Sequence, residues 1–466
     1  MDSKLARGLI VAAVALIIWF SPAPAGLTPQ VWRLFAIFVA TIMGFILQPL
    51  PISAVSILGL TIAGITGVLK PAEVLAGFGS PVIWLIFAAF LYAAGFIQTG
   101  LGQRIAYLFM RNLGDSTLKL AYAIILSDLM MSPATPSNTA RAGGILFPIV
   151  LSVAESFDSR PGPTARRVGA YLMKTVFQAD CITSSMFLTA SASNPLVVLL
   201  AASTLGTEIN WGLWALAAAV PGFVSLLATP YILYLIYPPE VTKTPEIKRQ
   251  AEKALTSLGP MSAKEKTVAA IFLLSLVLWS TGAITRIDAT MVAFLGVCLM
   301  LVTKVISWND ALEQKGAWDT MIWLGATISL ADALNNYGFF KFAMGGSAVL
   351  AGIPWQAAFA ILLLLFTYAH YGFAGNTPHV VAMYSAVGSL AIAAGTPPMM
   401  AALAFAFLNN LSSGITHYGN GPAVIYSGAG YVDQGTWMRL GAIVALINLV
   451  IWGGIGAIWW KVLGLW

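Results

Sequence analysis

Blocks of apolar residues long enough to cross a lipid bilayer recur along the whole chain, and they limit the possible folds more than any other feature. The clearest blocks cover residues 8–20, 32–48, 53–69, 209–237, 266–283, 287–303 and 437–460. A transmembrane helix needs about 20 such residues. Only 9% of the 466 residues are charged and 59% are hydrophobic, whereas soluble domains carry about 25% charged residues. The sequence therefore predicts an all-α polytopic membrane protein.

The charged residues and the cysteines exclude several other classes. The net charge of +6 does not indicate nucleic acid as a partner, because Lys and Arg lie between the apolar blocks. Cys181 and Cys298 fall in apolar segments, so we interpret them as packing residues rather than a disulfide. The three scattered His form no metal-site pattern, and no HExxH or GxSxG motif indicates an intramembrane enzyme. We expect no cofactor and no metal.

The distribution of Lys and Arg between the blocks predicts the topology. Lys4 and Arg7 place the N-terminus in the cytoplasm, before a first helix that we interpret as uncleaved. The basic linker 239–266 is also expected in the cytoplasm, as a surface helix. Six crossings before it and five after it give about 11 transmembrane helices, with the C-terminus outside. Two re-entrant helical hairpins, about 120–150 and about 355–392, dip into the membrane without crossing it.

The two halves of the chain, 1–238 and 267–466, resemble each other as an internal repeat. The matching segments are 83–85 with 322–324, Gly100 with Gly338, 137–139 with 375–377, and 193–195 with 420–422. The predicted topology places the two hairpins on opposite sides of the membrane, so the repeat is inverted. Inverted repeats with broken helices are typical of secondary transporters, whose sites lie where the repeats meet. Chance similarity among apolar residues is the alternative.

Polar residues interrupt the apolar pattern at two hairpin tips and in two broken helices, about 170–200 and about 400–428. Each tip precedes a helix whose first N–H groups and positive dipole end favour a carboxylate. Hydroxyls and amides at membrane depth need partners, and hydrogen bonding between helices is the alternative use. The predicted substrate-binding residues are Ser137, Asn138, Thr139, Gly375, Asn376, Thr377, Ser193, Asn194, Thr416 and His417.

One potential cation follows each tip at an equivalent position of the repeat. Arg141 lies four residues after Ser137, and His379 lies four residues after Gly375. A buried Arg is costly unless paired, so we predict that Arg141 and His379 compensate the charge of an anionic substrate. The alternatives are a structural ion pair of Arg141 with Asp128 or Asp180, and a neutral core role for His379.

At these residues the chain resembles the divalent anion:sodium symporter family over most of its length. Ser-Asn-Thr at 137–139 is similar to that family's hairpin motif, and Gly-Asn-Thr at 375–377 to its second copy. The stretches 137–144, 370–374 and 416–418 resemble the branch of citrate:succinate and tartrate:succinate exchangers and plastid 2-oxoglutarate/malate translocators. The resemblance implies a homodimer in the inner membrane, with a scaffold and a moving transport domain that works as an elevator.

The resemblance and the fixed cations together predict sodium-independent exchange of dicarboxylates. A dianion is costly to carry through a low-dielectric barrier unless its charge is neutralised. An empty site with uncompensated charge would move slowly, which gives exchange. The alternative is a sodium-coupled dicarboxylate symporter on the same fold, although Gly at 375 in place of Ser departs from the sodium-site pattern. Succinate, malate, fumarate, 2-oxoglutarate, tartrate and citrate all fit the residues.

Overall fold

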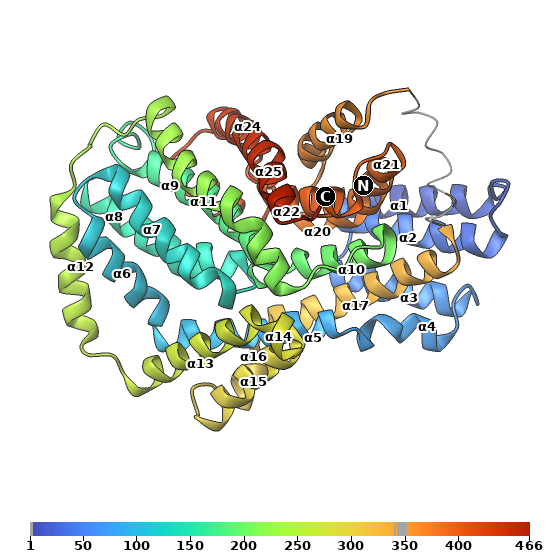
Figure 1. Cartoon of the computed structure of the whole chain (residues 1–466), viewed down its shortest axis with the longest axis horizontal. Helices are drawn as coiled ribbons and strands as arrows, with labels where there is room; N and C mark the ends of the chain where they lie inside the picture. Colours follow the sequence, from blue (N-terminus) through green and yellow to red (C-terminus); the bar gives the residue numbers. More distant parts are fainter. Residues whose placement is uncertain (1–2, 340–341, 343–351) are drawn as a thin grey trace.

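The computed structural model of the chain describes residues 3–339, 342 and 352–466, and helices are its regular elements (Figure 1). These residues contain no β-strand, so the predicted all-α class is confirmed. In hydrocarbon surroundings a helix is favoured because it satisfies its backbone hydrogen bonds within one segment.

Helices α1 to α11 form the first half, and side-chain caps start several of them. Thr28 Oγ1 accepts the N–H of Val31 before α2, and Asn210 Oδ1 accepts the N–H of Leu213 before α11. Such caps satisfy N–H groups that have no partner inside the helix. The bounds are α1 (Ser3–Phe20), α2 (Pro29–Leu47), α3 (Ile52–Ile65), α4 (Pro71–Leu75), η1 (Ala76–Gly79), α5 (Pro81–Thr99), α6 (Leu101–Leu113), α7 (Thr117–Met131), η2 (Ser132–Ala134), the π-helix η3 (Thr139–Leu146), α8 (Phe147–Ser156), α9 (Gly169–Met186), η4 (Leu188–Ala190), α10 (Ser193–Leu205) and α11 (Trp211–Ile236).

Helices α12 to α25 form the linker and the second half. Asp288 caps α15 by accepting the N–H of Thr290, and Asp433 caps α24 by accepting the N–H of Thr436. The bounds are α12 (Pro245–Leu258), α13 (Ala263–Ser280), α14 (Gly282–Thr285), α15 (Ala289–Val302), α16 (Trp308–Glu313), α17 (Lys315–Asn336), α19 (Trp355–Ala369), η6 (His370–Gly372), α20 (Asn376–His379), the π-helix η7 (Val380–Tyr384), α21 (Ser385–Ala393), α22 (Pro398–Ser412), α23 (Gly421–Gly428), α24 (Gln434–Val450), the π-helix η8 (Ile451–Gly456) and α25 (Ala457–Val462).

The helices form two groups that each pack largely within themselves. The outer group contains α1 to α5 and α13 to α17; α2 packs on α1 and α3, and α17 packs on α3 and α5. The hairpin group contains α7 to α11 and α19 to α25; α9 packs on α7, α11 and α22. In Figure 1 the outer group lies below and to the right, and the hairpin group lies above it. Helix α10 joins the groups through contacts with α5 and α17.

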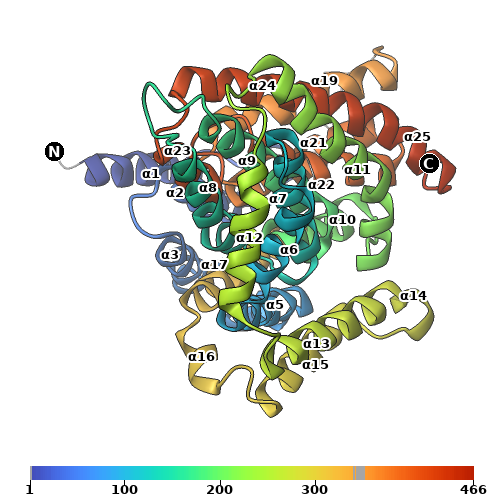
Figure 2. The same cartoon turned by 90° about the vertical axis from the view of Figure 1, so that its left-hand side faces the viewer.

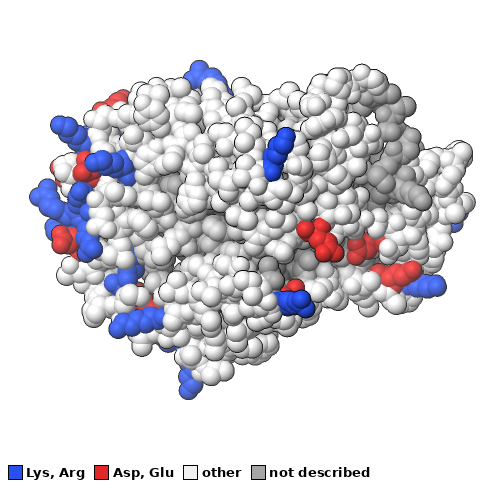
Figure 3. All heavy atoms as spheres, in the orientation of Figure 1, with Lys and Arg blue, Asp and Glu red and all other residues white. Residues whose placement is uncertain are grey.

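The helix α12 occupies the predicted linker 239–266 and packs on α6 at the surface (Figure 2). Ile247 and Ala251 form its buried face, while the basic side chains of Arg249 and Lys253 are exposed. Lys and Arg gather on the edge of the molecule where α6 and α12 lie, and uncharged residues cover most of the face in Figure 3. This distribution suits an apolar belt in a bilayer with one basic, membrane-flanking edge.

Within the described residues, four helical stretches are long and apolar enough to cross a membrane on their own: 29–47, 81–99, 211–236 and 434–462. Four shorter apolar helices, α3, α10, α15 and α22, supplement them. Fewer long apolar helices are found than the sequence predicted, and the broken helices explain part of this difference. The second polar break, for example, divides one predicted span into α22 and α23. The count of about 11 transmembrane helices stays a prediction.

Both cysteines are free, but they lie in different surroundings. Cys181 on α9 is buried, with its Sγ 3.6 Å from Ser413 Oγ. Cys298 on α15 is exposed. The interpretation as packing residues therefore fits Cys181 but not Cys298 within this chain, because apolar residues of a membrane helix can face the lipid as well as the protein core.

Candidate functional site

The first hairpin tip is the segment 135–138 between η2 and η3, in which Asn138 already has a helical backbone. Pro133 and Pro136 prevent α7 from continuing through it. Ser137 Oγ accepts the N–H of Ala140 at 3.1 Å, which caps the returning helix. Ser137 and Asn138 are half-buried, and Thr139 is exposed. The predicted polar residues of this tip are therefore accessible.

The second tip lies between η6 and α20, and it is partly accessible. Gly375 and Thr377 are half-buried, whereas Asn376 is only 8% exposed. Asn376 Nδ2 donates to Asn410 Oδ1 at 2.8 Å, and its Oδ1 has no partner among the described residues. The two tips thus differ in their described contacts: Asn376 of the second tip is bonded through its amide to α22, whereas the first tip is held through the Ser137 hydroxyl and the Thr135 carbonyl.

The first polar break, between α9 and α10, is closed by side-chain bonds to free backbone oxygens. Asn194 Nδ2 donates to the carbonyls of Ser184 and Phe187 at 2.8 and 3.0 Å. These lie at the C-terminal end of α9, where carbonyls have no partner inside the helix. Ser193 accepts a bond from Asn409 Nδ2 at 2.9 Å. Ser193 and Asn194 are both buried, so in this conformation they shape the break rather than line an open surface.

The second polar break, between α22 and α23, contains Thr416 and His417. Thr416 is fully buried, and its Oγ1 has no partner among the described residues. His417 is half-buried, with its ring packed edge-on against Tyr418 at a centroid distance of 4.8 Å. Asn420 caps α23 by accepting the N–H of Ala423 at 2.8 Å. His417 is therefore the accessible member of this pair.

Two adjacent residues of α22, Asn409 and Asn410, join the halves of the chain and escaped the sequence prediction. Asn410 Nδ2 donates to Asn194 Oδ1 at 2.7 Å, while its Oδ1 accepts from Asn376. A chain of three amides therefore connects the first break, α22 and the second tip. The signal was present in the sequence, since an Asn pair inside an apolar helix requires partners at membrane depth.

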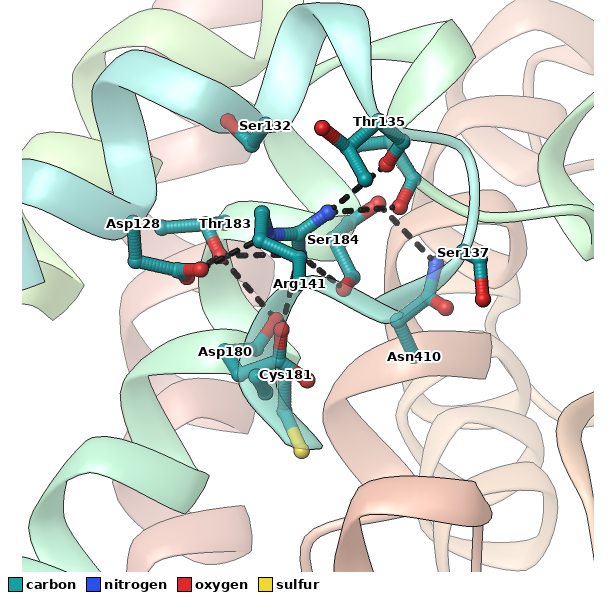
Figure 4. Close-up of polar contacts among 12 residues, drawn as sticks. Asp128, Ser132, Thr135, Ser137, Arg141, Asp180, Cys181, Thr183, Ser184 and Asn410 are labelled. Carbon is teal, nitrogen blue, oxygen red and sulfur yellow. Dashed lines mark hydrogen bonds and ion pairs between the residues drawn. The ribbon is translucent and has the colours of Figure 1, made fainter. Parts of the chain in front are cut away.

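The guanidinium of Arg141 is fully buried and enclosed by partners (Figure 4). Its Nε lies 2.7 Å from Asp128 Oδ1, and its Nη2 lies 2.8 Å from Asp180 Oδ1. It also donates to the carbonyls of Thr135 and Ala190, at 2.9 and 3.1 Å. The remaining bonds are to the hydroxyls of Thr183 and Ser184.

These contacts revise the interpretation of Arg141. The alternative ion pair is present with both aspartates at once, so one guanidinium faces two carboxylates. These carboxyl groups already balance its charge inside the chain. The direct use of Arg141 against a substrate stays a prediction, and these pairs weaken it. Arg141 instead ties the first tip, through the carbonyl of Thr135, to α7 and α9.

His379 is buried in an aromatic cage, and it has unused hydrogen-bonding capacity. Its ring lies 4.3 Å from Phe366, 4.8 Å from His370 and 5.1 Å from Phe373, measured between centroids. Neither ring nitrogen has a hydrogen-bond partner among the described residues. His370 is bonded through Nε2 to the carbonyl of Gly419 at 3.0 Å. The two predicted cations therefore differ in their hydrogen bonding. The guanidinium of Arg141 is surrounded by acceptors, whereas the ring of His379 has no hydrogen-bond partner among the described residues.

Each half of the chain packs a helix against the hairpin of the other half. Helix α23 packs on η3 of the first hairpin, where Tyr426 Oη donates to the carbonyl of Ala142 at 3.0 Å. Helix α10 packs on η7 and α21 of the second hairpin, where Thr204 Oγ1 lies 3.2 Å from Ser385 Oγ. This reciprocal contact brings both tips and both breaks into one region of the hairpin group.

The described residues contain no group of three His, Cys, Asp or Glu that could hold a metal ion. The chemistry on offer is instead hydrogen bonding by amides, hydroxyls and backbone N–H groups around two helix starts. That combination can bind an anion with polar ends.

Comparison with known proteins gives the family. The model of the sodium:sulfate symporter transmembrane region matches residues 2–466. The chain is 49% identical to a putative malate transporter, YflS, of Bacillus subtilis, over 99% of this chain and 97% of that protein. It is 46% identical to the chloroplastic dicarboxylate transporter 1 of Arabidopsis thaliana, over 97% of this chain and 82% of that protein.

A bacterial relative and a solved structure complete the comparison. The chain is 37% identical to the inner membrane protein YbhI of Escherichia coli, over 98% of this chain and 97% of that protein. The YdaH transporter of Alcanivorax borkumensis shares the fold at a TM-score of 0.53 and 13% identity, over 99% of this chain and 97% of that one. These matches confirm the resemblance that the sequence motifs predicted, and they confirm a transporter rather than an enzyme. The chain belongs to the sodium:sulfate symporter family of membrane transporters.

Proposed function

We propose that the chain exchanges dicarboxylate anions across the membrane in which it lies. The observation that carries the proposal is the convergence of two hairpin tips, each followed by a helix, and two polar breaks in one group of helices. The accessible polar residues there are Ser137, Asn138, Thr139, Thr377 and His417. The names of the relatives, a putative malate transporter and dicarboxylate transporters, support the substrate class.

Each tip offers the N–H groups of a helix start to one carboxylate. The first helix continues from Asn138 through η3 and α8, and the second from Asn376 through η7 and α21. Helix starts attract anions through their free N–H groups and dipole. A small molecule with a carboxylate at each end would bridge the tips, and His379 would serve the second end through a ring nitrogen that lacks a partner.

The grouping of the helices supports an elevator motion. Both tips and both breaks belong to the hairpin group, so a rigid shift of that group against the outer group would carry the whole site. The α6–α12 pair lies beside both groups and would serve as a flexible arm. We further propose that the protein forms a homodimer in the inner membrane, with its N-terminus in the cytoplasm and its C-terminus outside. Reporter fusions at each terminus test this orientation.

A sodium-coupled symporter is the second candidate, because one observation favours it. Three buried oxygens of the second half have no partner among the described residues: Asn376 Oδ1, Asn409 Oδ1 and Thr416 Oγ1. Unpaired buried acceptors are costly, and a cation would satisfy them. Sodium dependence of transport therefore separates the two candidates.

The test is uptake of radiolabelled succinate, malate or 2-oxoglutarate into proteoliposomes, with and without internal dicarboxylate. Exchange predicts uptake that needs internal substrate and is the same in sodium-free buffer. Uptake into empty vesicles driven by a sodium gradient would establish symport instead. An absence of dicarboxylate uptake under both conditions would contradict the substrate class.

A further inference from the structure

An apolar groove of about 790 Å³ lies in the outer group, and α1, α2 and α3 all line it. The three helices are found at the right-hand end of the molecule in Figure 1. Helix α2 packs on both α1 and α3, but many of the side chains that line the groove are short. These include Gly8, Ala12, Ala15, Ala36, Ala40 and Gly44. The chain's own side chains therefore leave the space between these helices open.

The hydroxyl groups in the lining are already used within their own helices. Thr41 Oγ1 donates to the carbonyl of Ile37 at 2.9 Å, and Thr66 Oγ1 donates to the carbonyl of Ile62 at 2.6 Å. Large, exposed apolar side chains also line the groove: Leu5, Leu16, Phe20, Leu50, Leu58 and Ile62. An exposed apolar groove of this kind suits an apolar chain rather than a polar molecule.

One end of the groove is basic. Among the described residues that line it, Lys4 is the charged one. Arg7 lies beside the same end, because its Nη1 donates to the carbonyl of Leu47, where α2 ends, at 3.3 Å. At the opposite end Arg33 is not part of the lining, and its guanidinium lies 5.4 Å from the ring centroid of Trp19. An anion held at Lys4 and Arg7 would therefore have the apolar groove next to it.

The length of the groove fits an acyl chain. Its lining on α1 runs from Lys4 to Phe20, which is about 24 Å along a helix axis. An acyl chain spans about 15 Å in one leaflet, half of the hydrocarbon core. Helix α2 is long and apolar enough to cross a membrane, so we expect the groove to lie within the bilayer. The bilayer itself would then supply the occupant.

We propose that this groove binds an anionic phospholipid, with an acyl chain between α1, α2 and α3 and the phosphate at Lys4 and Arg7. Basic pockets between transmembrane helices bind anionic head groups, and burial of methylene groups favours the bound chain. The lipid would hold α1 against the rest of the outer group. The groove lies apart from the hairpin tips, so the inference does not depend on which substrate is transported.

The first test compares two lipids with the same acyl chains, the anionic dioleoylphosphatidylglycerol and the neutral dioleoylphosphatidylcholine. Native mass spectrometry of the full-length protein in an uncharged detergent measures the affinity for each. We expect the anionic lipid to bind about tenfold more tightly, a difference of about 1.4 kcal/mol. Lys4→Gln combined with Arg7→Gln should remove most of this preference. Lys264→Gln combined with Lys266→Gln is the matched control, because it removes two exposed lysines of α13 and should keep the preference.

The second test locates the acyl chain with two neighbouring alanines of α1. Both are exposed, but Ala12 lines the groove and Ala13 does not. Ala12→Phe should fill the groove and weaken the binding of both lipids about tenfold, whereas Ala13→Phe should leave both affinities near wild type. Ala12→Leu is a smaller change at the same position, for use if Ala12→Phe does not fold.

Several outcomes would overturn the inference. These are equal wild-type affinities for the two lipids, an unchanged preference in the Lys4 and Arg7 variant, and equal effects of the two Phe changes. If Ala12→Phe lowers the oligomeric mass and leaves lipid binding unchanged, the groove holds a second copy of the chain and the inference fails. It also fails if neither Ala12 variant folds, because the groove is then not open. A wild type that binds the lipid but does not exchange dicarboxylates would contradict the proposed function alone.

Discussion

The side-chain amide of Asn410 donates to Asn194 at 2.7 Å and so joins the two halves of the chain. The acceptor belongs to the first polar break and the donor to α22 of the second half. Because Asn410 also accepts from Asn376 of the second tip at 2.8 Å, one residue connects three of the polar segments that the sequence singled out.

Replacing Asn410 with Ala should weaken the hairpin group and transport together. The change leaves Asn194 Oδ1 and Asn376 Nδ2 without these partners, and an unpaired buried polar group costs about 1–3 kcal/mol. We expect a lower Tm of the purified protein and a strong loss of exchange. Asn448→Ala is the control, because Asn448 is a buried asparagine of α24 whose Oδ1 has no partner among the described residues. Equal effects of the two changes would contradict a special role for Asn410.

Replacing Arg141 with Ala should abolish transport mainly by destabilising the protein rather than by removing a contact with the substrate. Asp128 and Asp180 would remain as buried carboxylates, and breaking a buried ion pair costs about 3–5 kcal/mol. We expect a large fall in Tm and the loss of exchange, and we expect the added changes Asp128→Asn and Asp180→Asn to restore part of the Tm. A variant with wild-type Tm and no transport would show that Arg141 serves the substrate directly.

Gly421 on α23 should tolerate a side chain poorly, because Thr139, the first residue of η3, lies against it. A Cβ at Gly421 would lie 2.0 Å from Thr139 Oγ1, and overpacking costs about 1–3 kcal/mol. We expect Gly421→Ala to lower the Tm, and Thr139→Ala in the same chain to recover part of the loss, which a double-mutant cycle measures. Gly428→Ala on the same helix meets no atom within 4 Å and should leave the Tm near wild type. Additive effects of the pair would argue against the contact.

The buried ion pair of Arg104 and Glu265 should matter far more than an exposed one. Arg104 on α6 lies 2.6 Å from Glu265 on α13 and donates to the carbonyl of Gly259 at 2.9 Å, so it fixes the end of the linker. We expect Arg104→Ala to lower the Tm by an amount that corresponds to about 3–5 kcal/mol. Asp115→Asn, in the exposed pairs with Lys119 and Lys248, should change stability by about 0–1 kcal/mol. Similar shifts in both variants would contradict this ranking.

The two tips show what local sequence can and cannot specify. Pro133 and Pro136 interrupt a helix, and Ser137 can cap the next one. The position of the first tip could therefore be predicted from the local sequence. The partners of the polar residues were not. Asn410 lies 34 residues from Asn376 and 216 from Asn194, and no local pattern indicates which amides will meet.

The sequence by itself determined the apolar helices, the polar interruptions and the repeat of the two tips, because hydrophobicity, proline and capping act within a few residues. Only the tertiary structure decided where the buried charges are balanced. Packing placed two carboxyl groups, those of Asp128 and Asp180, beside Arg141. The choice between a substrate-binding cation and a structural one therefore depends on distances across helices, which residue spacing along the chain does not contain.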